Sequence, residues 1–373
     1  MAETRLFKPL RLGTIKVQHR IGMAPLTRCR ATADCTPTAL MEEYYTQRAS
    51  IPGTLIITEG TMVSAAAAGG FPNAPGIWRA DQIAAWKTIT DAVHKKGSFI
   101  YVQLCAIGRA ADVGLAASEG IDIVGPSAIP IPHDEKPGAP TPRAMTIAEI
   151  KQTITDFVSA SQNAIAAGFD GVEIHGANGY LLDQFLQNTA NQRDDEYGGS
   201  VADRSRLLHK VLHEVVSAIG PDRVGLRLSP WSRFQGMRMG DPVRQFDDII
   251  DKANLLGLAY LHLVESRIFG AADHEGGANE TLDFAYERWN GPILVAGGYG
   301  PGTARRLVDE EYPDKDIVVI FGRHFVSNPD LVFRLKEGVH LAKYNRETFY
   351  VANSAVGYVD YPFSEEYSVS VTA

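Results

Sequence analysis

Short apolar segments recur along the chain and alternate with longer amphipathic ones. Eight of the apolar segments span four to six residues each and are rich in Val, Ile, Leu and Phe, without strict alternation of polar and apolar positions. Continuous apolar strands are typical of a parallel sheet that is covered on both faces. We therefore predict strands at residues 21–25, 54–58, 99–104, 171–175, 224–228, 260–264, 293–296 and 317–321.

The segments between these strands carry helix signals. Thr146 followed by Glu149 forms a capping box at the start of one segment. Asp81 near the start and Lys95 near the end of another suit the helix dipole, and Gly97 suits its termination. Helices are predicted at residues 80–96, 147–167, 200–219, 243–256, 281–289, 302–310 and 328–338.

Eight strands alternating with helices predict an α/β fold of the (β/α)8 TIM-barrel type, closed rather than open and doubly wound. Two short apolar runs on either side of Gly13, between Leu6 and Arg20, predict an N-terminal β-hairpin. The chain has 373 residues, and such barrels extend well beyond about 250 residues as one domain. We expect a single domain over residues 1–373.

Two connections are too long for plain turns. Residues 105–143 are rich in Gly, Ala and Pro, and residues 188–199 are polar and charged. Both follow the carboxyl ends of predicted strands, where barrel active sites lie, and long loops there usually bind or cover a ligand. The alternative is a surface insertion without function.

Composition narrows the partners. The formal net charge of −8 argues against nucleic acid and anionic membranes, which reward a basic surface. Three cysteines without a C-x-x-C pair fit a reducing compartment. Neither a secretory signal nor a membrane span of about 18 apolar residues is apparent. We expect a cytoplasmic protein, monomeric or homodimeric, whose partner is a small molecule.

The densest group of polar residues follows the fourth predicted strand. His175 ends this strand, and Asn178 and Tyr180 lie on the turn beyond it. His175 and Asn178 are two donors three residues apart, which can converge on one carbonyl oxygen and stabilise a developing enolate. Tyr180 is a weak acid that could protonate the carbon next to that carbonyl. The alternative is that His175 is structural and Tyr180 is a packed aromatic residue.

Several motifs resemble those of the old yellow enzymes. The strongest are residues 175–187 and 191–200, and the others are residues 24–28, 58–60, 102–104, 225–230, 296–298, 321–323 and 348–350. The resemblance covers residues 6–362 in the right order. The His-x-x-Asn spacing and the ending at residues 358–362 resemble the fungal branch of that family.

The resemblance implies that FMN lies across the barrel mouth. Thr27 would tune the flavin, Gln103 would reach its pyrimidine edge, and Arg227 would lie beside the nitrogen that becomes anionic on reduction. The phosphate would lie where the loops after the seventh and eighth strands meet. The implied cofactor-binding residues are Pro25, Leu26, Thr27, Gly60, Gln103, Arg227, Gly297, Gly298, Gly322 and Arg323.

The resemblance also implies a reaction, the reduction of an α,β-unsaturated aldehyde or ketone with NAD(P)H, and NADPH is the expected reductant. Flavin N5 would deliver hydride to the β-carbon, and Tyr180 would protonate the α-carbon while His175 and Asn178 hold the carbonyl oxygen. The implied substrate pocket consists of Phe71, Cys105, His175, Asn178 and Tyr350.

Three residues depart from the family pattern. Cys105 stands where many members carry tryptophan, Phe71 where tyrosine is common, and Gly298 where some relatives carry asparagine. The change at Cys105 should enlarge the pocket, so the departures put the substrate in doubt and not the reaction class.

Other readings stay open. A double-bond isomerase or a reductive cyclisation enzyme of a fungal natural-product pathway would keep the flavin. A barrel lyase or a ligand-binding protein would lack it. The run Asp273-His274-Glu275 has no partner cluster at metal-ligand spacing, so no metal site is expected.

Overall fold

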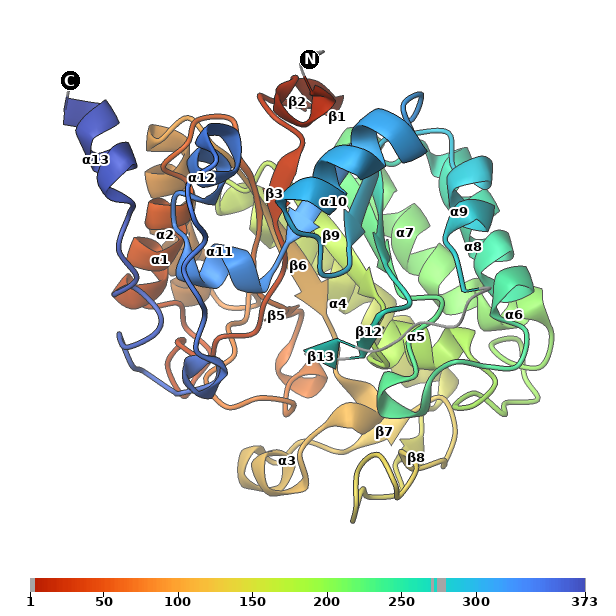
Figure 1. The fold of residues 1–373 in the computed structure, drawn as a ribbon. Helices are drawn as coiled ribbons and strands as arrows, with labels where there is room; N and C mark the ends of the chain where they lie inside the picture. The colour runs from red at the N-terminus through yellow and green to blue at the C-terminus, as the bar shows by residue number, and fades with distance from the viewer. Residues whose placement is uncertain (1–3, 270–271, 274–279, 373) are drawn as a thin grey trace.

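The computed structural model describes residues 4–269, 272–273 and 280–372. Eight parallel strands form a closed ring that is surrounded by helices (Figure 1). The ring closes because Ile21 pairs with Val319 and Leu55 pairs with Phe99. The predicted (β/α)8 barrel is thus confirmed. Its strands are β3 (Ile21–Met23), β4 (Leu55–Ile57), β6 (Phe99–Cys105), β9 (Gly171–Gly176), β10 (Val224–Leu228), β11 (Tyr260–Val264), β14 (Ile293–Ala296) and β15 (Ile317–Phe321).

The helices pack their apolar faces on the outside of the ring. The predicted capping box is present, since Thr146 Oγ1 accepts from the Glu149 amide at 3.3 Å and Glu149 Oε2 accepts from the Thr146 amide at 2.7 Å. The main helices are α1 (Ala39–Arg48), α2 (Ala80–Lys95), α4 (Ile147–Ala166), α7 (Arg206–Ile219), α8 (Pro242–Leu256), α9 (Asp283–Arg288), α10 (Pro301–Arg306) and α12 (Leu331–Glu337).

The structure differs from the predicted helices in several respects. The segment predicted at 200–219 is divided into α6 (Val201–Arg204) and α7, and α10 continues into a π-helical turn at Leu307–Glu311. Helix α1 was not predicted, because its buried face combines polar and aromatic side chains in place of an aliphatic stripe. Four short helices were also missed: α3 (Val113–Glu119), α5 (Leu181–Leu186), α11 (Arg323–Ser327) and α13 (Glu365–Thr372).

The predicted N-terminal hairpin closes one end of the barrel. Strands β1 (Leu10–Leu12) and β2 (Ile15–Val17) pair in antiparallel fashion. Leu12 and Val17 are fully buried and belong to one apolar cluster with interior residues of the barrel strands. The Thr14 amide donates to the carbonyl of Asp222, just before β10, so the hairpin lies at the amino ends of the strands. The opposite end is left for a ligand.

Two tyrosines fill the barrel interior above the hairpin. The rings of Tyr101 and Tyr260 lie 5.5 Å apart, and both are fully buried. A Cβ atom built on Gly225 would lie 2.2 Å from the Tyr260 ring, and one on Gly171 would lie 2.3 Å from the Tyr101 ring. Glycine on the neighbouring strand therefore makes room for each ring.

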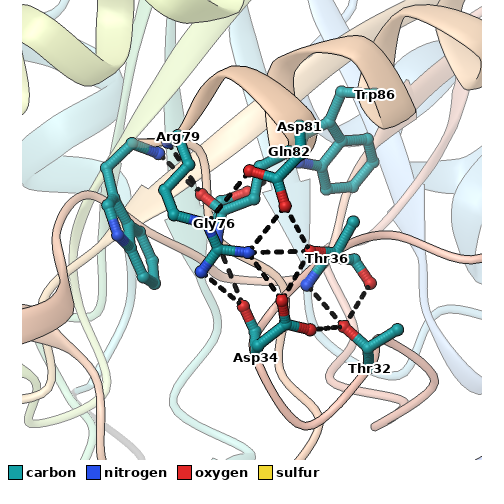
Figure 2. A network of polar contacts seen from close by, with 9 residues as sticks. Thr32, Asp34, Thr36, Gly76, Arg79, Asp81, Gln82 and Trp86 are labelled. Atoms are coloured by element: carbon teal, nitrogen blue, oxygen red, sulfur yellow. Dashed lines mark hydrogen bonds and ion pairs between the residues drawn. The ribbon is translucent and has the colours of Figure 1, made fainter.

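A polar network fixes the start of α2 (Figure 2). The Arg79 guanidinium lies 2.8 Å from a carboxylate oxygen of Asp34 and 2.8 Å from one of Asp81, and it also bonds Thr36. Gln82 Oε1 accepts from the Arg79 amide at 3.1 Å. Each such half-exposed pair contributes little alone, but together they hold the segment that follows β3 against α2.

The two long connections contain short helices and strands and touch each other. Residues 105–143 include α3 and β7 (Val124–Gly125), and β7 pairs with β8 (Arg143–Ala144). Arg193 of the second connection donates to the carbonyls of Pro126 and Met145 at 2.8 and 2.7 Å. Figure 1 shows α3, β7 and β8 at the end of the barrel opposite the hairpin. Both connections therefore contribute to the carboxyl-terminal end of the barrel.

Within the described ranges, no helix is long and apolar enough to cross a membrane. Among the same residues, no group of three or more His, Cys, Asp and Glu side chains is placed to hold a metal ion. Asp273 belongs to the short strand β13 (Ala272–Asp273), and His274 and Glu275 lie outside the described residues.

The packing of Tyr260 leads to a stability prediction. Gly225→Ala would place a methyl group 2.2 Å from two carbons of the Tyr260 ring. Overpacking of this kind costs about 1–3 kcal/mol. We expect a lower free energy of unfolding in urea titrations. Gly302→Ala in α10, whose Cβ would meet no atom within 4 Å, is the matched control and should not destabilise. Equal stability of the two variants would contradict the packing described here.

Candidate active site

A cavity of about 500 Å³ opens at the carboxyl ends of the barrel strands. This volume is within the range of small-molecule pockets. All ten residues predicted to bind the cofactor line it, and so do His175, Asn178, Tyr180, Phe71 and Tyr350. The structure thus brings together every predicted site residue except Cys105.

Parallel register sets the floor of this cavity. Arg227 on β10 pairs with His175 on β9 and with His262 on β11. Gln103 on β6 pairs with Glu173 on β9. Side chains in register on adjacent parallel strands point the same way, so these groups project into the barrel at neighbouring levels.

His175 is a neutral, nearly buried imidazole at the edge of this floor. It is 4% exposed, and its Nδ1 has no hydrogen-bond partner in the structure. Burial, followed by the nearby Arg227 guanidinium, holds the pKa of His175 well below its ordinary value. The neutral ring keeps one donor and one acceptor, so it can bond a ligand in the cavity.

Hydrogen bonds from the segment after β10 fix the turn that carries Asn178 and Tyr180. Asn178 has a left-handed backbone (φ 56°), its amide donates to Ser229 Oγ at 2.8 Å, and its carbonyl accepts from Gln235 Nε2 at 3.1 Å. The next amide, of Gly179, donates to Asp183 Oδ2 at 2.8 Å. These bonds use backbone groups and leave the two side chains to line the cavity.

Tyr180 keeps its proton at neutral pH. Burial raises the pKa of its phenol, nearby Cys105 and Tyr350 raise it further, and a hydrogen bond from Gln235 opposes the shift. The rings of Tyr180 and His175 lie 5.1 Å apart, edge to face. A proton donor and a neutral imidazole therefore face the same space.

Glycine-rich loops form the far end of the cavity. Gly297 and Gly298 follow β14, and Gly322 and Arg323 follow β15, where barrels commonly bind phosphate. Arg323 donates to the Tyr344 hydroxyl at 3.1 Å. Backbone amides and a guanidinium are suitable groups for an anion.

Segments distant in sequence complete the wall. Phe71 and Tyr350 stack with ring centres 6.2 Å apart. Arg28 donates to the carbonyls of Phe349 and Gly357 at 3.1 and 2.6 Å, and Arg30 donates to the Phe349 carbonyl at 2.7 Å. The C-terminal segment is thus fastened to the residues that follow β3.

Cys105 lies behind the cavity and does not line it. It is 2% exposed and packs with Met62 and Ile107. Its Cβ is 3.6 Å from the position that a Cβ on Gly60 would take, and Tyr180 packs against the same apolar cluster. Burial raises the pKa of the thiol, which keeps it protonated and unreactive.

Sequence reasoning assigned no role to several residues that support the site. Gln235 and Ser229 hold the Asn178 turn, and Glu173 and His262 lie beneath the cavity. Gln235 follows no motif, and only its fold-dependent contacts reveal it. Glu173 and His262 carry a signal, because a charged or ionisable residue inside a continuous apolar strand must face other polar groups.

The residues fit an FMN. Arg227 is a buried guanidinium whose Nε has no partner in the structure, at the floor of the cavity. Gly60 borders the cavity without a side chain, and Gln103 offers an amide there. A parallel barrel with these groups and an anion-binding end is typical of a flavin-binding barrel oxidoreductase.

Comparison with known proteins gives the family. The model of the NADH:flavin oxidoreductase / NADH oxidase family matches residues 5–342, so the chain belongs to that family. The chain is 39% identical to an Old Yellow Enzyme from Pichia sp. of known structure, with a TM-score of 0.89 over 98% of this chain and 95% of that one. The resemblance to old yellow enzymes is confirmed, and with it the FMN cofactor and the oxidoreductase class.

Curated fungal relatives cover nearly the whole chain. The "Chanoclavine-I aldehyde reductase fgaOx3" of Penicillium roqueforti is 52% identical, with 99% of each chain covered. The "Probable inactive reductase easA" of Epichloe festucae var. lolii is 51% identical, with 98% of this chain and 97% of that one covered. The "NADP-dependent oxidoreductase lnbE" of Aspergillus flavus is 47% identical, with 97% of each covered.

The neutral state of His175 can be tested directly. We expect its ¹³Cε1 resonance, assigned with His175→Gln, to stay unchanged between pH 8 and about 5.5, because burial lowers its pKa. His94 is the control, since its Nε2 lies 3.0 Å from Asp170 and this contact raises its pKa.

A His175 resonance that titrates near pH 6.5 would show that the ring is accessible to protonation. The lowered pKa of His175 also makes the folding stability depend on pH. Below about pH 6.5 the unfolded chain binds a proton at His175 that the folded chain does not, so this group's contribution is lost as the pH falls.

Proposed function

We propose that this flavin oxidoreductase uses NADPH to reduce the activated C=C bond of an α,β-unsaturated aldehyde. One observation carries the proposal: a neutral imidazole, an amide and a protonated phenol line the same cavity as the ten proposed FMN-binding residues. The aldehyde reductase named among the relatives favours an aldehyde over a ketone. The NADP-dependent relative favours NADPH over NADH.

The protein holds the cofactor by its edges. Pro25, Leu26 and Thr27 would border one side of the ring system, while Gln103 and Arg227 would hold its pyrimidine end. Gly297, Gly298, Gly322 and Arg323 would hold the phosphate, and Gly60 would leave room for the ring. Bound FMN would supply the two-electron hydride chemistry that links the nicotinamide to the alkene.

His175 and Asn178 bind the carbonyl oxygen of the substrate. Because His175 is neutral, its hydrogen bond polarises the carbonyl without placing a full charge there. The fixed Asn178 backbone keeps the side-chain amide in place, so the two donors stabilise the charge that develops on oxygen. The alkene is thereby activated at its β-carbon.

Tyr180 delivers a proton to the α-carbon. Its raised pKa keeps the phenol protonated until negative charge develops on the substrate. One relative is named as probably inactive, but this chain has a complete acid and carbonyl-binding set, which favours net reduction. Phe71 and Tyr350 stack at the mouth and confine a flat, conjugated substrate.

The visible spectrum is the first experiment. We expect a yellow flavin band that NADPH bleaches without oxygen and that cinnamaldehyde or 2-cyclohexenone restores, with the saturated product formed. A protein that stays colourless after incubation with FMN would overturn the proposal. Conversion of an alkene to its isomer without consumption of NADPH would show an isomerase instead.

The role of Tyr180 predicts a separation of the two half-reactions. Tyr180→Phe should lower alkene reduction by roughly 10²–10⁴-fold, the contribution of a general acid. FMN content and oxidation of NADPH with oxygen as acceptor should stay at the wild-type level. Tyr312→Phe, which removes a phenol bonded to Asp283 outside the cavity, is the control. Wild-type alkene reduction by Tyr180→Phe would assign the proton to another donor.

A further inference from the structure

A carboxylate with no exposure to solvent lies directly beneath the cavity. Glu173 belongs to β9 and is 0% exposed. We propose that Glu173 is a positioning residue for FMN: it turns the Gln103 amide so that its carbonyl oxygen faces the flavin, and its charge offsets that of Arg227. This inference rests on the proposed FMN site.

Two strong hydrogen bonds fix the carboxylate. Glu173 Oε1 accepts from Gln103 Nε2 at 2.7 Å, and Oε2 accepts from His262 Nδ1 at 2.8 Å. His262 belongs to β11, two strands away from β9, while Gly225 on the intervening β10 pairs with Glu173 and has no side chain. The Tyr260 ring occupies the space that a side chain on Gly225 would fill, so no β10 side chain at this level stands between Glu173 and His262.

The carboxylate decides the orientation of the Gln103 amide. An ionised carboxylate only accepts hydrogen bonds, so the amide must present its NH₂ group to Glu173. The carbonyl oxygen then points the other way, and it lies 3.6 Å from the position of a Cβ on Gly60, a residue of the cavity wall. The cavity thus offers an acceptor, which suits the imide N–H of a flavin pyrimidine ring.

Charge balance is the second consequence. Burial acts to raise the pKa of Glu173, but His262, Arg227 and the Gln103 hydrogen bond outweigh it and lower the pKa, so the group is ionised. Burial and Arg227 lower the pKa of His175, and at His262 burial and Arg227 outweigh Glu173, which raises the pKa, so both rings are neutral. The floor therefore carries one positive charge and one negative charge.

This balance bears on the reduced flavin, which is negatively charged. Arg227 stabilises that charge and Glu173 opposes it, and both act in a buried region where electrostatic interactions are strong. Glu173 accordingly keeps the bound FMN harder to reduce than Arg227 alone would, and the reduced enzyme is a stronger hydride donor.

Two variants separate orientation from charge. Glu173→Gln keeps an acceptor for Gln103 and removes the charge. We expect FMN binding within about threefold of wild type, and at least a tenfold shift toward reduced flavin in equilibrium with a reference dye. Glu173→Leu removes both functions, so FMN affinity of the apoprotein, followed by quenching of flavin fluorescence, should fall at least tenfold.

An FMN analogue methylated at the imide nitrogen tests the orientation itself. Wild-type apoprotein should bind FMN more tightly than this analogue. In Glu173→Leu the amide is free to turn, and the preference should decrease at least fivefold. Asp330→Asn, which removes another fully buried carboxylate paired with Arg334 away from the cavity, should change neither the dye equilibrium nor this preference.

The outcomes are distinguishable. Wild-type protein without FMN would overturn the proposed function itself. Wild-type protein that binds FMN, together with a Glu173→Gln dye equilibrium within twofold of wild type and an unchanged analogue preference, would overturn only the role of Glu173. If Glu173→Leu does not fold, the isosteric Glu173→Gln variant still tests the charge.

Discussion

The parallel register of four adjacent strands determines the rest of the site. From β6 through β9 and β10 to β11, alternate side chains point into a closed ring, and the pairing places Gln103, Glu173, Arg227 and His262 at neighbouring levels. A slip of one residue on any of these strands would turn its polar groups outward onto the apolar helices. The strands therefore cannot vary their register without burying unpaired charge.

The site combines groups on strands with groups on loops, and the two sets are held in place in different ways. His175 and Arg227 are held by strand pairing, whereas Asn178 and Tyr180 depend on a turn that Ser229 and Gln235 hold from the neighbouring connection. The long 105–143 connection joins this arrangement, because Arg109 donates to the Gln235 carbonyl at 3.0 Å. Substitutions in that connection can therefore shift Asn178 and Tyr180 through Gln235.

Much of the fold could be predicted from the sequence, for a physical reason. All eight barrel strands are short apolar runs, because each is covered on both faces, and this pattern is local. Helix α1 escaped prediction since buried Tyr44, Tyr45 and Arg48 give no aliphatic stripe. The predicted FMN residues line one cavity, yet Cys105 is not among its lining residues, because the neighbours of a residue at a strand end depend on tertiary packing and not on spacing. The supporting role of Gln235 is equally non-local.

The hydrogen bonds from Arg28 and Arg30 to the segment around Phe349 have a consequence for biosynthesis. The ring closes only when Phe321 pairs with Met23, which joins the last barrel strand made on the ribosome to the first. The aromatic wall at Phe349 and Tyr350 is attached later still, by arginines translated more than 300 residues earlier. A nascent chain that has not yet reached Tyr350 therefore lacks this part of the cavity wall.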